Sequence, residues 1–298
     1  MKRFFLALVL GALGAGLLMW GCASVLLAEG LVRRGGVGAL AAYSPAAEPG
    51  GGETWRVQAA DGVTLSGVFR PGASHRWALL LHGYTAGKEA MGLYADAYAA
   101  RGWCTLAPDL RGHGDSGGRY VGMGWADKGD VLCWLAAIRA RDPEAEIVLH
   151  GVSMGGAAAL SAAAARPAGL MAVVSDCAYS DLWELTGYQA ARYLGASLTP
   201  LRYGASLATR FLAGYRWQAA SPESEMQKIG VPTLLLHGDA DRFVPVSMAY
   251  ALYSAAECPK RLVLTPGAGH AASALRDPEG YWQAVFSFLE ETALTARQ

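Results

Sequence analysis

The segment from Ile147 to Gly156 reads I-V-L-H-G-V-S-M-G-G and holds a serine in a setting that can activate it. A short apolar run, typical of a buried strand, ends in G-x-S-x-G, and an alanine-rich helical run follows. A nucleophilic serine carried on a sharp strand-to-helix turn needs this context. We therefore predict that Ser153 is a nucleophile. We also predict that the Met154 N–H, at the start of the helix, stabilises a developing oxyanion.

A second serine, Ser116, lies in G-D-S-G-G, which also fits G-x-S-x-G and resembles the serine motif of trypsin-like proteases. Those proteases are all-β proteins, whereas this chain alternates strand and helix patterns. No strand directly precedes Ser116, and the surrounding glycines indicate a loop. The context therefore favours Ser153.

An activated serine needs a base, and the base needs a carboxylate that orients it. Of the six histidines, only His270 both follows Ser153 in sequence and lies in a loop after the last predicted strand. Three aspartates follow strands and could orient it: Asp176, Asp239 and Asp241. The residues alone leave this choice open, and the remaining two are expected to serve as turn or cap residues.

The oxyanion also needs a second N–H donor, which is expected in the loop after an early strand. The segment L-L-L-H-G-Y from Leu79 to Tyr84 supplies such a loop. We predict the N–H of Tyr84 as this donor, with Gly83 allowing close approach.

Elements that alternate along the chain must position these residues. Apolar runs typical of buried strands are separated by helical stretches, which predicts a mostly parallel sheet of about eight strands with helices on both faces. The predicted strands are 54–59, 64–69, 77–81, 103–107, 147–150, 170–175, 232–237 and 261–264, and the predicted helices are 88–101, 125–140 and 154–166.

The stretch between Ser175 and Pro232 is too long for a simple crossover and is rich in aromatic residues. We predict that residues 178–221 form a small helical cap above the carboxyl ends of the strands, where ligands bind in open sheets. Trp183, Tyr188 and Trp217 are candidates to contact an apolar substrate. The alternative is that the aromatic residues only pack the insertion onto the domain.

The amino terminus carries an uncharged run from Phe4 to Ala28 after Lys2 and Arg3. At about 1.5 Å per residue it can span a bilayer core of about 30 Å. We expect residues 1–28 to be a single-pass anchor, 29–53 a linker and 54–298 the catalytic domain. A cleaved signal peptide and a lipoprotein modified at Cys22 remain open alternatives. Basic residues on both sides of the run leave the membrane side undetermined.

The amino-acid composition bears on which classes of partner and cofactor the chain binds. The 298-residue chain has a formal net charge of zero, with 53% hydrophobic and 17% charged residues, so nothing indicates a nucleic-acid partner. The five cysteines form no C-x-x-C pair, and we expect no disulfide framework, no metal site and no cofactor. The oligomeric state is not predicted.

These motifs resemble those of the α/β-hydrolase superfamily. L-H-G-Y, D-L-R-G-H-G-D-S-G-G, H-G-V-S-M-G-G, H-G-D-A-D-R-F-V-P and G-A-G-H occur in that order over about residues 55–292. Within the superfamily the chain is similar to membrane-tethered bacterial hydrolases of the YqkD type and to serine aminopeptidase S33-like hydrolases. The resemblance implies that the orienting acid is Asp241, the final aspartate of its motif, and that the segment containing Ser116 is structural.

The resemblance also implies hydrolysis of an ester, thioester or amide through an acyl-enzyme intermediate, with a small-molecule or acyl substrate. Two rival functions are an acyltransferase, in which an alcohol replaces water, and a non-catalytic binding protein on the same fold. The simultaneous presence of Ser153, Asp241 and His270 argues against the second rival.

Overall fold

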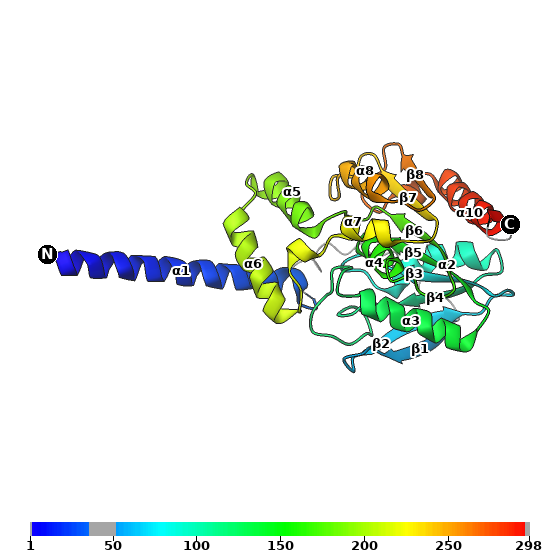
Figure 1. The fold of residues 1–298 in the computed structure, drawn as a ribbon, viewed down its shortest axis with the longest axis horizontal. Coiled ribbons are helices and arrows are strands. Elements are labelled where there is room, and N and C mark those ends of the chain that lie inside the picture. The colour runs from blue at the N-terminus through cyan, green and yellow to red at the C-terminus, as the bar shows by residue number, and fades with distance from the viewer. Residues whose placement is uncertain (1, 36–51, 296–298) are drawn as a thin grey trace.

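An eight-stranded sheet forms the centre of the protein (Figure 1), and the computed structural model describes residues 2–35 and 52–295. The spatial order is β1-β2-β4-β3-β5-β6-β7-β8; β2 pairs antiparallel with β1 and β4, and the other neighbours are parallel. The predicted mostly parallel sheet is thereby confirmed. The strands are β1 Glu53–Gln58, β2 Thr64–Arg70, β3 Arg76–Leu81, β4 Cys104–Pro108, β5 Glu146–Val152, β6 Leu170–Asp176, β7 Thr233–Gly238 and β8 Lys260–Thr265.

Helices cover both faces of this sheet, as expected for strands that are apolar on both sides. In β3, Leu79 and Leu81 belong to the core beneath α3 and α4, whereas Ala78 and Leu80 belong to the core beneath α2 and α10. The helices are α1 Lys2–Val32, α2 Gly92–Ala99, α3 Lys128–Arg141, α4 Met154–Ala163, α5 Leu182–Leu194, α6 Thr199–Leu212, α7 Pro222–Glu225, α8 Val246–Ala255, α9 Ser273–Arg276 and α10 Pro278–Thr295.

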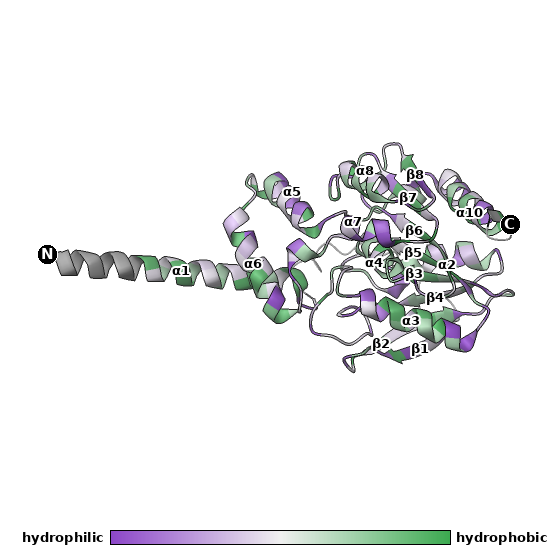
Figure 2. Ribbon diagram, viewed as in Figure 1, coloured by the Kyte–Doolittle hydropathy of each residue, from purple (hydrophilic) through white to green (hydrophobic). Residues whose placement is uncertain are grey.

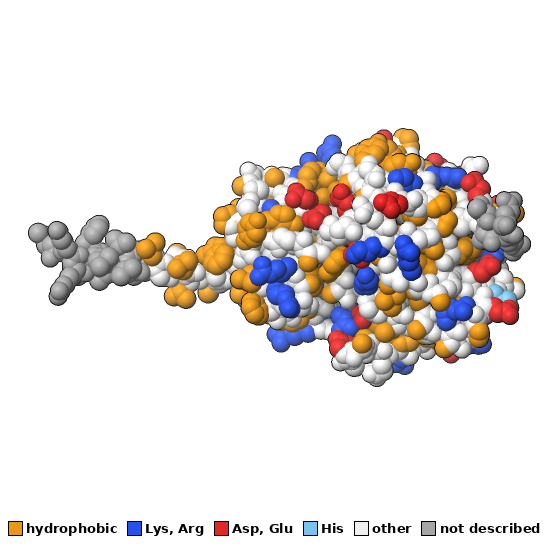
Figure 3. All heavy atoms as spheres, viewed as in Figure 1, with side chains coloured by type: hydrophobic (Ala, Val, Ile, Leu, Met, Phe, Trp, Pro, Cys, Tyr) orange, Lys and Arg blue, Asp and Glu red, His pale blue; other side chains and the backbone are white. Residues whose placement is uncertain are grey.

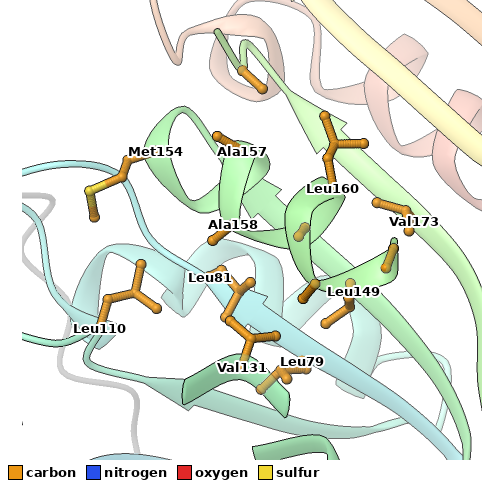
Figure 4. Packing of buried hydrophobic residues seen from close by; sticks show 14 of the residues in the cluster. Leu79, Leu81, Leu110, Val131, Leu149, Met154, Ala157, Ala158, Leu160 and Val173 are labelled. Atoms are coloured by element: carbon orange, nitrogen blue, oxygen red, sulfur yellow. The ribbon is translucent and has the colours of Figure 1, made fainter. Parts of the chain in front are cut away.

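The helix that follows Ser153 is buried along its whole length. Every residue of α4 is buried, and its alanines let it approach the sheet closely (Figure 4). Ala157 and Leu160 pack with Leu149 of β5 in one core cluster, and the strands and α4 form a hydrophobic centre (Figure 2). The element that carries the serine is therefore rigidly seated.

Helix α1 projects away from the domain at its amino-terminal end and docks on it at the other (Figure 1). Ser24, Ala28 and Val32 are buried, and the Val121 N–H donates to the Val32 carbonyl at 2.7 Å. The span Leu13–Val32 is long and apolar enough to cross a membrane by length and composition.

The predicted boundary between residues 28 and 29 lies within helix α1. We expected residues 29–53 to be a tether that holds the domain clear of the bilayer, but the helix continues through Val32 and its end is part of the domain core. Residues 36–51 of that linker lie outside the described residues.

The insertion between β6 and β7, for which a small helical cap was predicted, contains the helices α5 and α6, followed by short helical turns. Arg202 of α6 is buried and joins the pair: its guanidinium lies 3.9 Å from the ring centre of Trp183 and donates to the Trp183 carbonyl and to Thr186. Burial lowers the pKa of Arg202. This buried arginine fixes the distance between the two cap helices.

Candidate active site

Ser153 occupies a strained turn between β5 and α4. Its backbone has φ 57° and ψ −118°, a conformation that non-glycine residues rarely adopt. The turn is closed by glycines: a side chain on Gly151 would collide with the Gly155 carbonyl, and one on Gly155 would collide with the Leu81 backbone. The G-x-S-x-G spacing therefore reflects close backbone packing, and the turn leaves Ser153 partly exposed.

The structure brings Ser153, His270 and Asp241 together in one hydrogen-bonded line. His270 Nε2 lies 2.8 Å from Ser153 Oγ, and His270 Nδ1 lies 2.7 Å from Asp241 Oδ2. Because a carboxylate only accepts, Nδ1 carries the ring proton and Nε2 is free to accept the serine proton. These distances meet the geometric requirement for a base that activates a nucleophile.

Asp241 is held in place by its own loop. Its side chain is fully buried, and Oδ1 accepts hydrogen bonds from the N–H groups of Phe243 and Val244 at 2.8 and 2.9 Å. On the other side His237 Nε2 lies 3.0 Å from the Val244 carbonyl and 3.5 Å from Asp241 Oδ2. Burial lowers the pKa of His237, so this second histidine stays neutral beside the acid.

The two other candidate acids have different positions. Asp239 is exposed, and its Oδ1 accepts from the Gly267 N–H at 2.6 Å, which ties two loops together. Asp176 is fully buried at the end of β6, and neither of its carboxylate oxygens has a well-formed hydrogen bond among the described residues. Burial raises the pKa of Asp176 to about 7, although Tyr281 and His270 partly offset the effect. The hydrogen-bonding position next to His270 belongs to Asp241.

The two N–H groups predicted as oxyanion donors belong to segments next to Ser153. Met154 begins α4 directly after Ser153, and Gly83 packs so closely that a side-chain carbon on it would lie 3.4 Å from Ser153 Cβ. Tyr84 follows Gly83 in that loop, and within the described part of the chain neither Tyr84 nor Met154 donates its N–H to another group. Both donors are therefore available to a ligand.

Ser116 is in a different environment. It is fully buried, its Oγ donates to the Asp109 carbonyl at 2.6 Å and it accepts from the Ser66 N–H at 2.9 Å. The glycine loop around it is tied down by Lys88, whose Nζ lies 2.6 Å from Asp109. The environment of Ser116 is structural.

The three cap aromatics predicted to contact substrate differ in exposure. Trp217 is only 2% exposed, and its indole donates to Thr209 at 3.0 Å, so its environment is one of packing. Trp183 is half-buried against Arg202 and Tyr203. Tyr188 is half-buried on α5. Its neighbour Gln189 contacts Phe243 in the loop that carries Asp241.

This contact between the cap and the loop that carries Asp241 was not predicted from sequence. Gln189 of α5 donates to the Phe243 carbonyl at 3.3 Å, and the ring of Phe243 lies 4.9 Å from that of His270. Phe243 is thus the link between cap and base. Its position in the motif that contains Asp241 was the only available signal.

Cys177 was also not predicted to belong to the site. Cys177, Asp241 and His270 each place a possible ligand atom within 4.8 Å of the others. In the described structure both nitrogens of His270 are hydrogen-bonded, Nε2 to Ser153 and Nδ1 to Asp241. The site also concentrates backbone strain, because four of the seven described non-glycine residues with positive φ lie in it or next to it: Thr85, Ser153, Cys177 and Ala271.

Comparisons with known proteins show which family and which fold this chain resembles. The sequence pattern of the Alpha/beta hydrolase family matches residues 78–284. The chain is 31% identical to the uncharacterized protein Rv2307c of Mycobacterium tuberculosis over 243 residues, covering 80% of this chain and 79% of that protein. It is 28% identical to the uncharacterized protein YqkD of Bacillus subtilis over 214 residues, covering 71% and 70%.

Solved structures share the fold. The Pyrococcus furiosus esterase PF2001 matches with a TM-score of 0.69 at 23% identity, covering 83% of this chain and 95% of the esterase. The esterase RhEst1 from Rhodococcus matches with a TM-score of 0.59 at 20% identity, covering 80% and 98%.

Proposed function

This chain belongs to the alpha/beta hydrolase family, and we propose that it is a membrane-anchored serine hydrolase that acts through an acyl-enzyme intermediate. The observation that carries the proposal is the continuous hydrogen-bonded line from Asp241 through His270 to Ser153. Its expected substrates are esters, thioesters or amides with an apolar acyl group.

In the first half-reaction Ser153 Oγ would attack the carbonyl carbon of the substrate while its proton moves to His270 Nε2. The N–H groups of Tyr84 and Met154 would stabilise the negative charge on the carbonyl oxygen. The intermediate then collapses: the bond to the leaving group breaks, and His270 returns the proton to the departing atom. Asp241 accepts from Nδ1 throughout and stabilises the imidazolium.

In the second half-reaction water attacks the acyl-enzyme, His270 takes one of its protons, and the carboxylic acid leaves as Ser153 regains its hydrogen. An acyltransferase would use an alcohol in place of that water on the same residues. The two activities are distinguished by whether an added alcohol is consumed.

The contacts between the cap and α1 support the proposal that α1 is not cleaved from the protein. A side chain on Gly204 of α6 would collide with Ser24, and Trp20 donates to the Pro200 carbonyl at 3.1 Å. Cleavage near residue 28 would expose this face of α6 and remove Ala28 from the core. The structure therefore favours an uncleaved anchor over a cleaved signal peptide.

The test is labelling of the full-length protein in membranes with a fluorophosphonate, followed by hydrolysis of p-nitrophenyl esters of increasing chain length. We expect labelling at Ser153 and turnover of at least one ester. A chain that is folded but neither labels nor turns over any ester or amide would contradict the proposal and favour a binding protein.

A further inference from the structure

The cap has an apolar surface that no described residue covers. Its members are exposed side chains at the end of α5 and along one stripe of α6: Tyr193, Leu194, Tyr203, Leu207 and Phe211. The last three are spaced by four residues, which places them on one helix face. Phe211 is 82% exposed and Leu194 67% exposed. We refer to these five residues as the outer cap face.

This face lies at the level of α1 where the helix meets the domain. The indole N–H of Trp20 donates a hydrogen bond to the Pro200 carbonyl at the start of α6. One turn further along both helices, Ser24 of α1 fills the space beside Gly204 of α6. The α5–α6 connection lies on the side of the domain toward which α1 projects (Figure 1), and hydrophobic and basic side chains gather there (Figure 3). Any bilayer that holds α1 must therefore come close to the outer cap face.

The length of α1 indicates how close the bilayer comes to the outer cap face. The part that projects before Trp20, residues 2–19, measures roughly 27 Å at about 1.5 Å per residue. A bilayer core is about 30 Å thick. The uncharged run continues to Ala28, alongside the cap. Insertion of residues 2–19 in the bilayer core brings Trp20 to the interface, where tryptophan is enriched, and the start of α6 with it.

The charge of the cap suits the same location. The cap, residues 178–221, carries Asp181 and Glu184 at the start of α5, and its remaining charged residues are four arginines. Arg192, Arg210 and Arg216 are exposed, whereas Arg202 is buried within the cap. An apolar stripe bordered by arginines is the pattern of a helix that lies in the interface of a membrane containing anionic lipids.

We propose that the outer cap face lies in the interface of the bilayer that holds α1, and that the site receives amphiphilic acyl esters directly from that bilayer. The second part rests on the proposed function. It is supported by the connection from α5 to the site, because Gln189 contacts the Phe243 carbonyl and Phe243 packs on His270. The cap thus joins a lipid-facing surface to the candidate base.

The first experiment measures depth in the membrane. Full-length protein carrying Cys22→Ala, Cys133→Ala and Cys258→Ala receives a fluorophore at Phe211→Cys and is reconstituted in phosphatidylcholine–phosphatidylglycerol vesicles. Lipids brominated near the headgroup should quench it strongly. The control is Leu294→Cys, an exposed position near the end of α10 on the opposite side of the domain, which should remain unquenched.

Two results would overturn the location. One is an unquenched fluorophore at position 211 while a fluorophore at Leu13→Cys in α1 is quenched, which would show an inserted anchor with a cap clear of the lipid. The other is a fluorophore at 211 that is shielded from lipid, together with cross-linking of the unlabelled Phe211→Cys thiol to a second copy or another protein. Neither result depends on catalysis, so failure of Ser153 to label with fluorophosphonate would separately contradict only the proposed function.

The second experiment tests delivery. Phe211→Asp should lower the hydrolysis rate of a long-chain ester dispersed in vesicles by about tenfold, as expected from loss of one buried apolar anchor. Labelling by fluorophosphonate and hydrolysis of a short soluble ester should stay unchanged, as should every rate of Leu294→Asp. An equal loss on both substrates, or no loss on the vesicle substrate, would overturn direct delivery.

Discussion

The hydroxyl of Tyr84 donates a hydrogen bond of 2.5 Å to the carbonyl of Leu31 in α1. Tyr84 is also the residue whose N–H we propose as an oxyanion donor, so the end of α1 supports the loop that carries this proposed donor. Arg34 continues this contact by donating to the carbonyls of Gly114 and Ser116 in the glycine loop. The carboxyl-terminal end of α1 is therefore a structural part of the domain.

Two truncations test this role of α1. Deletion of residues 1–19 removes the projecting part and leaves the docked part, so the protein should retain its melting temperature and its fluorophosphonate labelling. Deletion of residues 1–34 also removes the buried Ala28 and Val32 and the partner of Tyr84, so both should fall. Thermal unfolding and labelling check both variants. Equal stability of the two would contradict the docking.

Replacement of the proposed nucleophile should abolish covalent labelling. Ser153→Ala should lower kcat by about 10⁴- to 10⁶-fold, because the residues that act with the serine cannot replace it. The control is Ser116→Ala, which loses two buried hydrogen bonds and about 1–3 kcal/mol of stability but should still label. Labelling of Ser153→Ala and not of Ser116→Ala would invalidate the assignment.

The acid is tested by a pair of isosteric changes. Asp241→Asn should lower kcat by about 10⁴-fold, because an amide no longer fixes the proton on His270 Nδ1. Asp239→Asn should change kcat little, since Asp239 only ties its loop to Gly267. Steady-state ester hydrolysis distinguishes the two variants. Addition of a chelator should leave the wild-type rate unchanged.

The buried carboxyl of Asp176 predicts a pH-dependent stability. Its pKa is raised by burial from 3.8 to about 7, so the folded state binds more protons than the unfolded state between these values. Unfolding then releases a proton, and the free energy of unfolding falls as pH rises through this window. The free energy of unfolding of the wild type, relative to that of Asp176→Asn, should fall between about pH 4 and pH 7 and stay constant above about pH 7.

Urea unfolding of both proteins across this range measures the difference. Comparing the two removes the contributions of other buried groups, such as Asp127 with a pKa raised by burial to about 7 and His113 with one lowered by burial to about 4. A difference that stays constant with pH would show that Asp176 does not titrate in this window.

We expect the cap aromatics to fall into two groups: residues that stabilise the fold by packing and residues that determine substrate selectivity. Trp217→Ala should cost about 3–5 kcal/mol, because it removes a large, fully buried ring. Tyr188→Ala should leave stability nearly unchanged and shift the preferred acyl chain length. Denaturant unfolding and a chain-length series of p-nitrophenyl esters test each variant. Unchanged selectivity of Tyr188→Ala would assign that residue to packing as well.

Local patterns were sufficient to predict much of the fold. Sequence patterns placed all eight strands to within a few residues. Inner strands such as β3 and β5 were recognisable as apolar runs, because a strand buried on both faces must be apolar throughout. The turn around Ser153 was predictable for the same local reason, since only glycines at Gly151 and Gly155 permit the backbone contacts that close it.

The sequence by itself determined the strand order in the chain, the serine turn and the histidine loop, because each depends on neighbours a few residues apart. The residues alone left three aspartates open and the family resemblance pointed to Asp241, whose hydrogen bond to His270 is a tertiary contact. Only the tertiary structure decided that Phe243 links the cap to the candidate base and that the end of α1 belongs to the domain. These contacts join residues that are far apart in sequence. Their partners are fixed by how β6, β7 and the cap pack in space, and such packing leaves no local pattern.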